Sequence, residues 1–367
     1  MTRPWPHQAV ALVLAAAVAA TAPLARADQA SAALAKYAAP VDKAIDKALA
    51  YLGAQQLDDG SFSGSLKTAF RSRKGASSGG GNTAVTSLCV MAFLAKGHTP
   101  GTGPYGDVIN RGIDFVLSRQ QSNGLLVAKG VSHGSMYYHG MATLMLSEVS
   151  GMVSPQRQKR LDAGLSKALH LILAAQKVRK PSKYQGGWRY QPTSVDSDIS
   201  LTGWSLMALR SARNNGAPVP LESIESAVRF VMNCRVGGGA FAYKPGSGGG
   251  LARTGVALLC LEICGRHRNA ACTGAGGYIL AHLPKHFGGS YFYYALYYCS
   301  QGMFQLGGAQ WEKFADHMFA MMLKFQQPDG AWPQGGGTEA KAGKCYSTAM
   351  GVLAMSVAYR QLPIYQR

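Results

Sequence analysis

The chain has 367 residues. Its 47% hydrophobic content supplies material for a sizeable core, and its 45 glycines indicate many tight turns rather than a collagen-like repeat. A balance of 37 lysines and arginines against 18 acidic residues leaves a formal charge of +19, which indicates an anionic partner or surface. No nucleic-acid recognition motif accompanies this charge in a chain that we expect to be exported, so the sequence argues against a nucleic-acid partner.

Residues 1–27 are predicted to be a secretory signal peptide. Arg3 precedes an apolar run over residues 9–20, and Ala25-Arg26-Ala27 supplies the small residues of a cleavage site. The run is shorter than the ~20 apolar residues of a membrane span, and no later stretch of the sequence approaches that length. We therefore expect export to the periplasm or the medium, with an uncleaved anchor as the alternative.

Residues 28–43 are predicted to be a lead-in, and residues 44–367 a single domain in which one unit recurs six times. Each unit has an amphipathic helix, a polar turn, a glycine-rich loop and a helix that is apolar nearly all round. In chain order, the amphipathic stripes are Ile45, Leu49 and Leu52; Ile109, Ile113 and Val116; Leu161, Leu165 and Ile172; Ile224, Val228 and Val231; a weak helix over 272–283; and Trp311, Phe314, Met318 and Phe325. The apolar helices are expected over 83–96, 139–149, 199–212, 254–264, within 287–308, and over 346–359.

Terminating glycines mark the ends of the apolar helices, where a left-handed C-terminal cap belongs. They are Gly97, Gly151, Gly216, Gly265 and Gly307, and their spacings of 54, 65, 49 and 42 residues fall near the period of a helix-pair repeat. Twelve helices of alternating character fit a closed ring with six apolar helices inside and six amphipathic ones outside. An open solenoid would also pair helices, but it should carry distinct polar end caps.

The segment 185–204 is the clearest copy of the unit. Gly186 and Gly187 allow a sharp turn beside the large Trp188. Asp198 then occupies the N-cap position of an apolar helix, where its carboxylate can accept an exposed amide of the first turn. Its structural interpretation is therefore that of a plain helix cap.

Several motifs resemble a known superfamily. Gln56-xxx-Gly60-x-Phe62 and Gln326-xxx-Gly330-x-Trp332 are similar to the QxxxGxW repeats of squalene and oxidosqualene cyclases, and Gln120-xxx-Gly124 is a degenerate copy. SLTGWSLMAL (200–209) is similar to inner-helix segments of these cyclases, and FYYALYYCSQG (292–302) resembles protein prenyltransferase β subunits. Over residues 40–360 the chain resembles the prenyltransferase and squalene-oxidase repeat superfamily. The resemblance implies an all-α (α/α)6 toroid, a closed barrel of six inner and six outer helices.

The resemblance also suggests an acid site. Squalene-hopene-type cyclases protonate their substrate with an Asp in a D-x-D-D-T-A motif, and the nearest match is Asp196-Ser197-Asp198-Ile199-Ser200. Asp198 would be the acid, and Asp196 would replace the adjacent carboxylate that is Ile199 here. These cyclases usually contain two helical domains, whereas this chain has one. His139, at the start of a predicted inner helix, is a further acid–base candidate or a simple hydrogen-bonding residue.

Protein prenyltransferases bind zinc through Asp, Cys and His, and those ligands are not matched. Tyr294 stands at the His position of the similar segment 293–299, and the Asp-x-Cys pair has no counterpart. We expect no metal and no other cofactor.

Aromatic and basic residues complete the predicted site. Trp188, Tyr291, Tyr294 and Tyr297 are candidates to line a cavity that holds an isoprenoid, since aromatic faces stabilise cations, although such rings equally pack cores. Arg71, Arg73 and Arg253 lie in loops expected at one rim, together with six helix N-termini suited to an anionic head group. The same rim would dock on an anionic membrane, or its charge would be diffuse and serve only solubility.

Two functions follow from these residues. The first is a terpenoid-cyclase-like enzyme that acts on an isoprenoid or another lipid through Asp198 and Asp196. The second is a non-catalytic exported toroid that binds an anionic lipid or a partner protein through its basic rim.

Overall fold

The computed structural model describes residues 31–64, 81–128, 131, 134–284 and 287–365. Within these ranges the chain forms twelve α-helices, short 3₁₀ turns and isolated β-bridges. The outer helices are α1 (Ala32–Ala54), α3 (Gly106–Ser118), α5 (Pro155–Lys177), α7 (Leu221–Asn233), α9 (Ala270–Ala281) and α11 (Gly308–Phe325). The inner helices are α2 (Thr83–Ala95), α4 (Ser135–Glu148), α6 (Ile199–Asn214), α8 (Leu251–Ile263), α10 (Phe292–Leu306) and α12 (Lys344–Met355).

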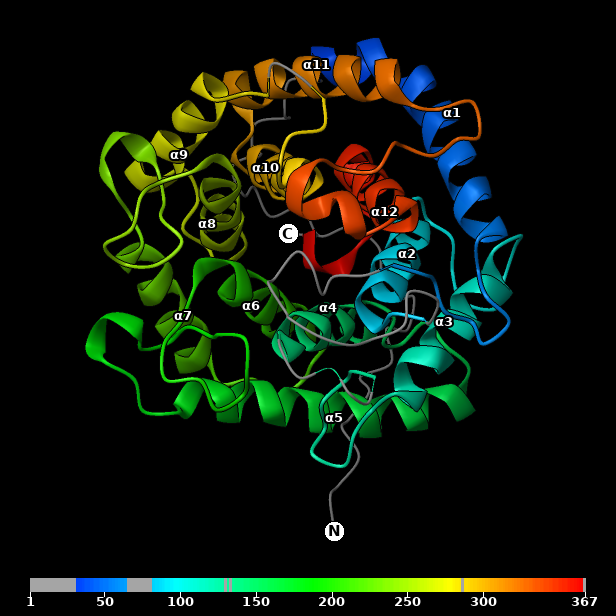
Figure 1. Cartoon of the computed structure of the whole chain (residues 1–367), viewed down its shortest axis with the longest axis horizontal. Coiled ribbons are helices and arrows are strands. Elements are labelled where there is room, and N and C mark those ends of the chain that lie inside the picture. The colour runs from blue at the N-terminus through cyan, green and yellow to red at the C-terminus, as the bar shows by residue number, and fades with distance from the viewer. Residues whose placement is uncertain (1–30, 65–80, 129–130, 132–133, 285–286, 366–367) are drawn as a thin grey trace, which may run out of the picture.

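The two sets of helices form concentric rings (Figure 1). Each inner helix packs against the next one in the ring, and α12 packs against α2. In the outer ring α11 packs against α1, so the end of the chain meets its beginning. The inner helices are buried nearly all round, while the outer ones bury one stripe. The prediction of an all-α, closed (α/α)6 toroid is confirmed.

The first helix corrects the predicted boundary at residue 44. α1 begins at Ala32, because Ser31 caps it by accepting a hydrogen bond from the Leu34 amide at 3.2 Å. Its first turns pack against α11, where Glu312 accepts from the Ala33 amide at 2.9 Å. Most of the expected lead-in 28–43 is therefore part of the outer ring, while the predicted signal peptide 1–27 lies outside the described residues.

The QxxxG motif works as a staple between successive outer helices. The Gln56 side-chain amide donates to the Gly60 carbonyl of its own turn at 2.9 Å and to the Val108 carbonyl of α3 at 2.8 Å. The corresponding pairs of acceptors are Gly124 and Gly164 for Gln120, Gly186 and Ser223 for Gln176, and Gly330 and Ala44 for Gln326. The last of these staples joins α11 to α1 and closes the ring.

Glycine is required in each staple because the turn approaches the next outer helix closely. Gly60, Gly124, Gly186 and Gly330 all have positive φ, and at Gly60 a Cβ would lie 2.5 Å from the Arg111 carbonyl oxygen. The aromatic residue that follows fills the space behind the turn. The Trp188 indole N–H donates to the Ile172 carbonyl at 2.8 Å, and Trp332 repeats this bond to Met322. The motif is thus architectural.

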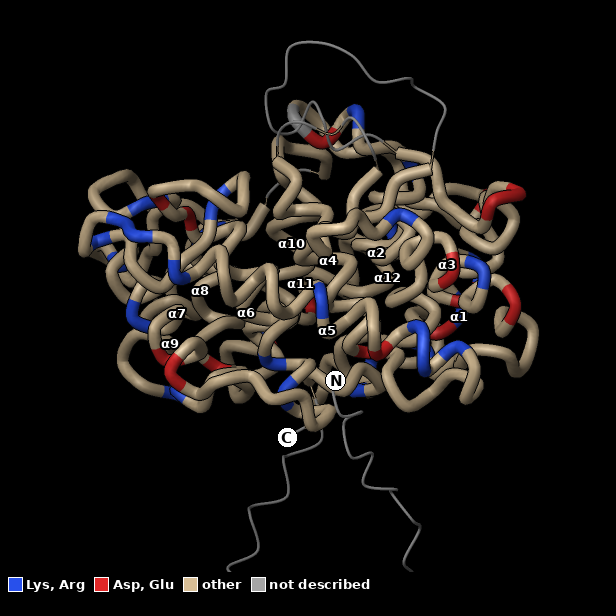
Figure 2. Tube along the Cα trace, turned by 90° about the horizontal axis from the view of Figure 1, so that it is seen from below, with Lys and Arg blue, Asp and Glu red and all other residues tan. Residues whose placement is uncertain are grey.

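The two ends of the ring differ. The long connections from each outer helix to its inner partner gather at one end, while short turns and the described C-terminal residues lie at the other (Figure 2). None of the described helices is long and apolar enough to cross a membrane.

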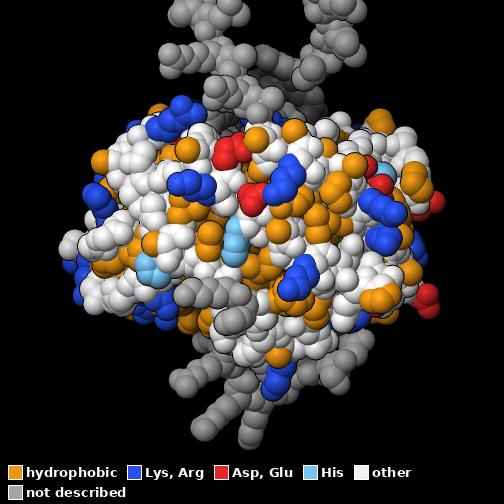
Figure 3. Space-filling view, turned by 90° about the horizontal axis from the view of Figure 1, so that it is seen from above, with side chains coloured by type: hydrophobic (Ala, Val, Ile, Leu, Met, Phe, Trp, Pro, Cys, Tyr) orange, Lys and Arg blue, Asp and Glu red, His pale blue; other side chains and the backbone are white. Residues whose placement is uncertain are grey.

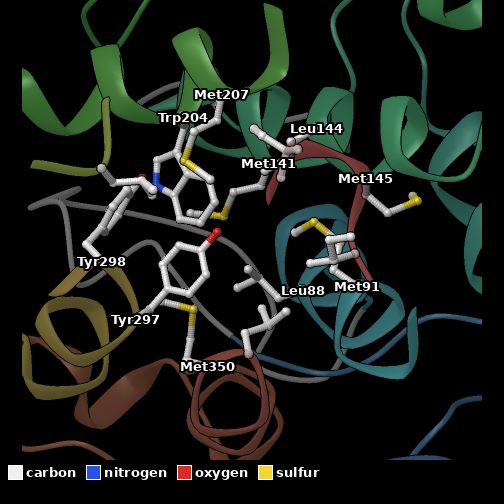
Figure 4. Close-up of a cluster of buried hydrophobic side chains, with 14 of the residues drawn as sticks. Leu88, Met91, Met141, Leu144, Met145, Trp204, Met207, Tyr297, Tyr298 and Met350 are labelled. Carbon is white, nitrogen blue, oxygen red and sulfur yellow. The ribbon is translucent and has the colours of Figure 1, made fainter. Parts of the chain in front are cut away.

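The centre of the ring is filled by side chains, which we call the axial core (Figure 4). Trp204 of α6 stacks on Tyr297 of α10 with ring centroids 5.5 Å apart, and Tyr298 meets the same indole edge-on at 5.3 Å. Methionines and leucines from four inner helices pack around these rings: Leu88, Met91, Met141, Leu144, Met145, Met207 and Met350. At the short-turn end of the ring, Tyr365 packs against the axial core, and its hydroxyl forms a hydrogen bond of 2.7 Å with the Tyr297 hydroxyl.

Candidate functional site

One cavity opens at the long-loop end of the ring, above the axial core. It has a volume of about 250 Å³ and lies at the N-terminal ends of α4, α6, α8, α10 and α12. Six tyrosines, one arginine and one carboxyl group line it, with a few small or apolar residues. The lining residues are Tyr137, Met141, Tyr190, Ser200, Tyr243, Ala252, Arg253, Tyr291, Tyr294, Glu339, Ala342 and Tyr346, and we call this the tyrosine pocket.

Glu339 forms one wall of the pocket. It comes from the last long loop and is 2% exposed. Its carboxylate accepts the backbone amides of Tyr293 and Tyr294 at 3.0 and 2.9 Å and the Tyr346 hydroxyl at 3.1 Å, so it caps α10. Burial raises the pKa of Glu339 to about 7, and the three donors oppose this rise. A carboxyl group able to change charge near neutral pH therefore faces the ligand space.

Asp198 stands behind the opposite wall. It caps α6 by accepting the Leu201 amide at 2.9 Å, as predicted for its N-cap position, and it is fully buried. The Tyr243 hydroxyl, which lines the pocket, lies 3.1 Å from the Asp198 carboxylate and 2.6 Å from the Tyr190 hydroxyl. Burial raises the pKa of Asp198 to about 6, although the hydrogen bonds from Leu201, Arg189 and Tyr243 favour the charged form and limit this rise. Asp198 therefore reaches the pocket through a tyrosine relay.

Arg189 joins the two predicted acidic residues. Its guanidinium contacts Asp198 at 2.9 Å and Asp196 at 3.4 Å, and Lys244 lies 2.6 Å from Asp196. The same guanidinium lies over the Tyr190 ring at 4.1 Å. A guanidinium that contacts both carboxyl groups separates them, so this is not the arrangement of two acids that share a proton. Asp196 lies at the outer side of the network rather than in the lining of the pocket.

The structure sorts the other predicted residues into two groups. Tyr291, Tyr294 and Arg253 line the tyrosine pocket, with Tyr291 42% exposed at the mouth. Arg253 lies over the Tyr243 ring at 5.9 Å and donates to the Gly248 carbonyl at 2.8 Å. Tyr297 and Trp188 lie outside this pocket: Tyr297 belongs to the axial core, and Trp188 packs behind its glycine turn and donates to α5. Arg71 and Arg73 lie outside the described residues.

His139, the further acid–base candidate, lies apart from the tyrosine pocket. It is fully buried and lies outside the pocket lining. Its Nδ1 accepts the Leu126 amide at 3.1 Å, and its Nε2 donates to the Ala168 carbonyl at 3.1 Å. Burial lowers the pKa of His139 to about 4, so it remains neutral over the physiological range. It takes the structural role that the sequence left open.

His139→Ala should lower the free energy of unfolding by about 2–5 kcal/mol. The change leaves the Leu126 amide unpaired in the interior, at ~1–3 kcal/mol, and removes the bond to the Ala168 carbonyl, at ~0.5–1.5 kcal/mol. Urea unfolding followed by circular dichroism measures the loss. His170→Ala on the exposed side of α5 is the matched control and should change stability by less than about 0.5 kcal/mol. Equal stability of the two variants would contradict the structural role.

The sequence predicted three of the twelve lining residues, Tyr291, Tyr294 and Arg253. Glu339, Tyr346, Tyr190 and Tyr243 were not singled out, and all four lie in or beside loops that converge only in the closed ring. The signal available for Tyr190 and Tyr243 was an aromatic residue shortly after a glycine turn. For Glu339 the sequence offers one acid in a glycine-rich loop, which is not a recognisable motif.

The remaining surfaces offer less. Among the described residues, no group of three His, Cys, Asp or Glu side chains is placed to hold a metal ion, and the seven cysteines carry free thiols. A second hollow of about 370 Å³, the α1 groove, lies between the start of α1, Phe319 and Tyr359 and has mainly apolar walls. On the side of the ring formed by α1 and α11, the cations are spread among polar and apolar atoms, and some lie beside acidic groups (Figure 3).

Comparison with known proteins identifies the fold. No protein-family model matches the chain, and no curated protein matches its sequence significantly. Among solved structures, the type II terpene cyclase MstE from Scytonema, in complex with geranylgeranyl dihydroxybenzoate, has a TM-score of 0.60 at 14% identity, covering 90% of this chain and 100% of the cyclase.

Two glycosidases resemble the chain as closely. An inactive α-1,6-mannanase of Salegentibacter sp., in complex with α-1,6-mannotriose, has a TM-score of 0.63 at 8% identity, covering 88% of this chain and 99% of the mannanase. A glycosidase in complex with glucose has a TM-score of 0.57 at 14% identity, covering 87% and 97%. At these identities the likeness concerns the toroid fold alone, which is shared by enzymes of different chemistry.

Proposed function

We propose that the chain binds a compact isoprenoid with an anionic head group in the tyrosine pocket. The observation that carries the proposal is the combination of six tyrosine rings with Arg253 at the N-terminal ends of five inner helices. Rings offer apolar faces to a prenyl chain. Helix N-termini and a guanidinium favour an anion. Export of the mature chain stays a prediction from residues 1–27.

The size of the cavity supports a short ligand. Small-molecule sites usually measure about 300–1,000 Å³, and this pocket of about 250 Å³ lies just below that range. The axial core fills the space below it, so a triterpene such as squalene has no room there. The proposal therefore favours one to three prenyl units over the longer polyene of a squalene-cyclase-like reaction.

The pocket walls suit binding more directly than cyclisation. Asp198 lies behind Tyr243 and is paired with Arg189, so it has no direct contact with the ligand space. Any proton given to a ligand would come from Glu339, or from Asp198 through the Tyr243 hydroxyl. We propose a binding protein in the first place, and catalysis becomes an outcome of the experiment that follows.

Arg253→Gln should weaken the binding of geranyl and farnesyl diphosphates at least about tenfold. A hydrogen bond to a charged group contributes ~1.5–3 kcal/mol, and each 1.4 kcal/mol is tenfold in the dissociation constant. Calorimetric titration of the mature protein measures the change, and mass spectrometry of the same mixtures reports any cyclic or dephosphorylated product.

The matched control is Lys159→Gln, which removes the same charge from an exposed position on α5. It should bind within about twofold of the parent. A panel with squalene and α-1,6-mannotriose separates the ligand classes. Binding of the saccharide without the prenyl diphosphates would overturn the proposal in favour of a sugar ligand, and equal weakening by both variants would assign the effect to net charge.

A further inference from the structure

We infer that anion binding in the tyrosine pocket is coupled to the uptake of one proton by Glu339. The inference rests on the proposed function and adds regulation of the same site by pH. Glu339 and Arg253 line a single cavity. An anionic head group held by Arg253 therefore lies in the same small space as the carboxyl group.

Hydrogen-bond donors, not an ion pair, hold the Glu339 carboxylate. From α10 it meets Phe292, Tyr293 and Tyr294, and from α12 Tyr346. Burial raises the pKa of Tyr293, Tyr294 and Tyr346 above the usual range, so these rings stay neutral. Across the residues that the structure describes, no Lys, Arg or His forms an ion pair with Glu339; Arg253 of α8 is the cation in the pocket lining.

The charge of Glu339 then decides how the pocket receives an anion. The ionised carboxylate accepts three hydrogen bonds but repels a second negative charge within the same small cavity, whose protein walls screen Coulomb interactions less than bulk water does. The protonated group removes that repulsion and can donate a hydrogen bond to the ligand. Because burial already raises the pKa of Glu339 to about 7, protonation costs little near neutral pH. An anionic ligand raises this pKa further.

The coupling predicts the direction in which the dissociation constant of the anion changes with pH. Below pH 7 Glu339 is largely protonated in the free protein, and the dissociation constant should not change with pH. Above pH 7 the free protein must first take up a proton, so the dissociation constant rises by up to about tenfold per pH unit. The probe is a prenyl sulfonate, whose charge is constant over this range, so that the ligand itself does not titrate.

Glu339→Gln should abolish the rise. Its dissociation constant for the prenyl sulfonate should stay within about twofold between pH 6 and 8.5, whereas that of the parent rises at least fivefold. Glu148→Gln is the control, since Glu148 is also buried with a raised pKa but lies outside the pocket lining, and it should keep the parental slope. A parental profile without slope, or the same slope in Glu339→Gln, would overturn the inference.

A second measurement covers the case in which Glu339→Gln fails to fold because the cap of α10 is weakened. Calorimetry of the parent at pH 8, in buffers of different ionisation enthalpy, counts the protons taken up on binding. Uptake near one proton supports the inference, and zero uptake contradicts it. Failure of the proposed function is distinguishable, because the parent would then not bind the sulfonate at any pH.

Discussion

Replacing Gly330 with alanine is expected to lower the free energy of unfolding by about 2–5 kcal/mol and to make the ring open at the junction of α11 and α1. Gly330 has a φ of +88°, which costs an L-residue ~1–2 kcal/mol. Its Cβ would also lie 2.7 Å from the carbonyl carbon of Lys47, and the overpacking of such a contact costs ~1–3 kcal/mol. Chemical unfolding measures the total.

The control for Gly330→Ala is Gly216→Ala. Gly216 has nearly the same φ, +86°, but nothing lies within 4 Å of its Cβ position. Gly216→Ala should therefore lose only the stability that a positive φ costs an alanine, about 1–2 kcal/mol. Hydrogen exchange should show faster opening of α1 and α11 in Gly330→Ala but not in Gly216→Ala. Equal losses in the two variants would mean that the staple does not hold the ring closed.

The second large effect is a loss of stability as the pH rises, through Glu148. This α4 carboxyl is fully buried, is hydrogen-bonded by the Ser211 hydroxyl and accepts the Ile364 amide at 3.3 Å. Burial raises its pKa from 4.5 to about 7. The folded state favours the protonated form of Glu148. The stability that Glu148 contributes to the folded state is therefore fully present below pH 4.5 and is lost as the pH rises through 7. The shift corresponds to about 3 kcal/mol.

Glu148→Gln removes this titration while preserving the shape of the side chain. Relative to the parent, the variant should gain stability between pH 4.5 and pH 8, by up to about 3 kcal/mol in urea unfolding. Glu222→Gln, on the exposed first turn of α7, should follow the parental curve. A constant difference between Glu148→Gln and the parent across this range would show that Glu148 does not titrate as its burial implies.

Most of the fold could be predicted from the sequence because the residues that specify each staple lie close together in the chain. A glutamine at a helix end, a glycine turn and an aromatic residue specify a staple, and Gln56, Gln120 and Gln326 identify three of them directly. The Gln176 staple could not be recognised, because ten residues separate Gln176 from Gly186, instead of the four residues of the QxxxG motif. The start of α1 at Ala32 could not be predicted, because a proline such as Pro40 usually ends a helix, whereas here it lies inside one.

The site was less predictable because it depends on depth along the ring axis. Tyr294 and Tyr297 both belong to α10 and lie three residues apart, which is about 4.5 Å along the helix. The pocket occupies only the first turn, so Tyr294 lines it while Tyr297 is packed in the axial core. Glu339 meets α10 only after the ring has closed, and no pattern in its own loop announces that contact.

Photo-crosslinking with a diazirine-bearing geranyl diphosphate tests most directly whether the tyrosine pocket is the ligand site. The label should appear by peptide mass spectrometry in segments 137–141, 243–253 and 291–294, and excess unmodified ligand should remove it. Label concentrated in the α1 groove, at residues 34–42 or Phe319, or spread over the outer helices, would contradict an isoprenoid site in this pocket.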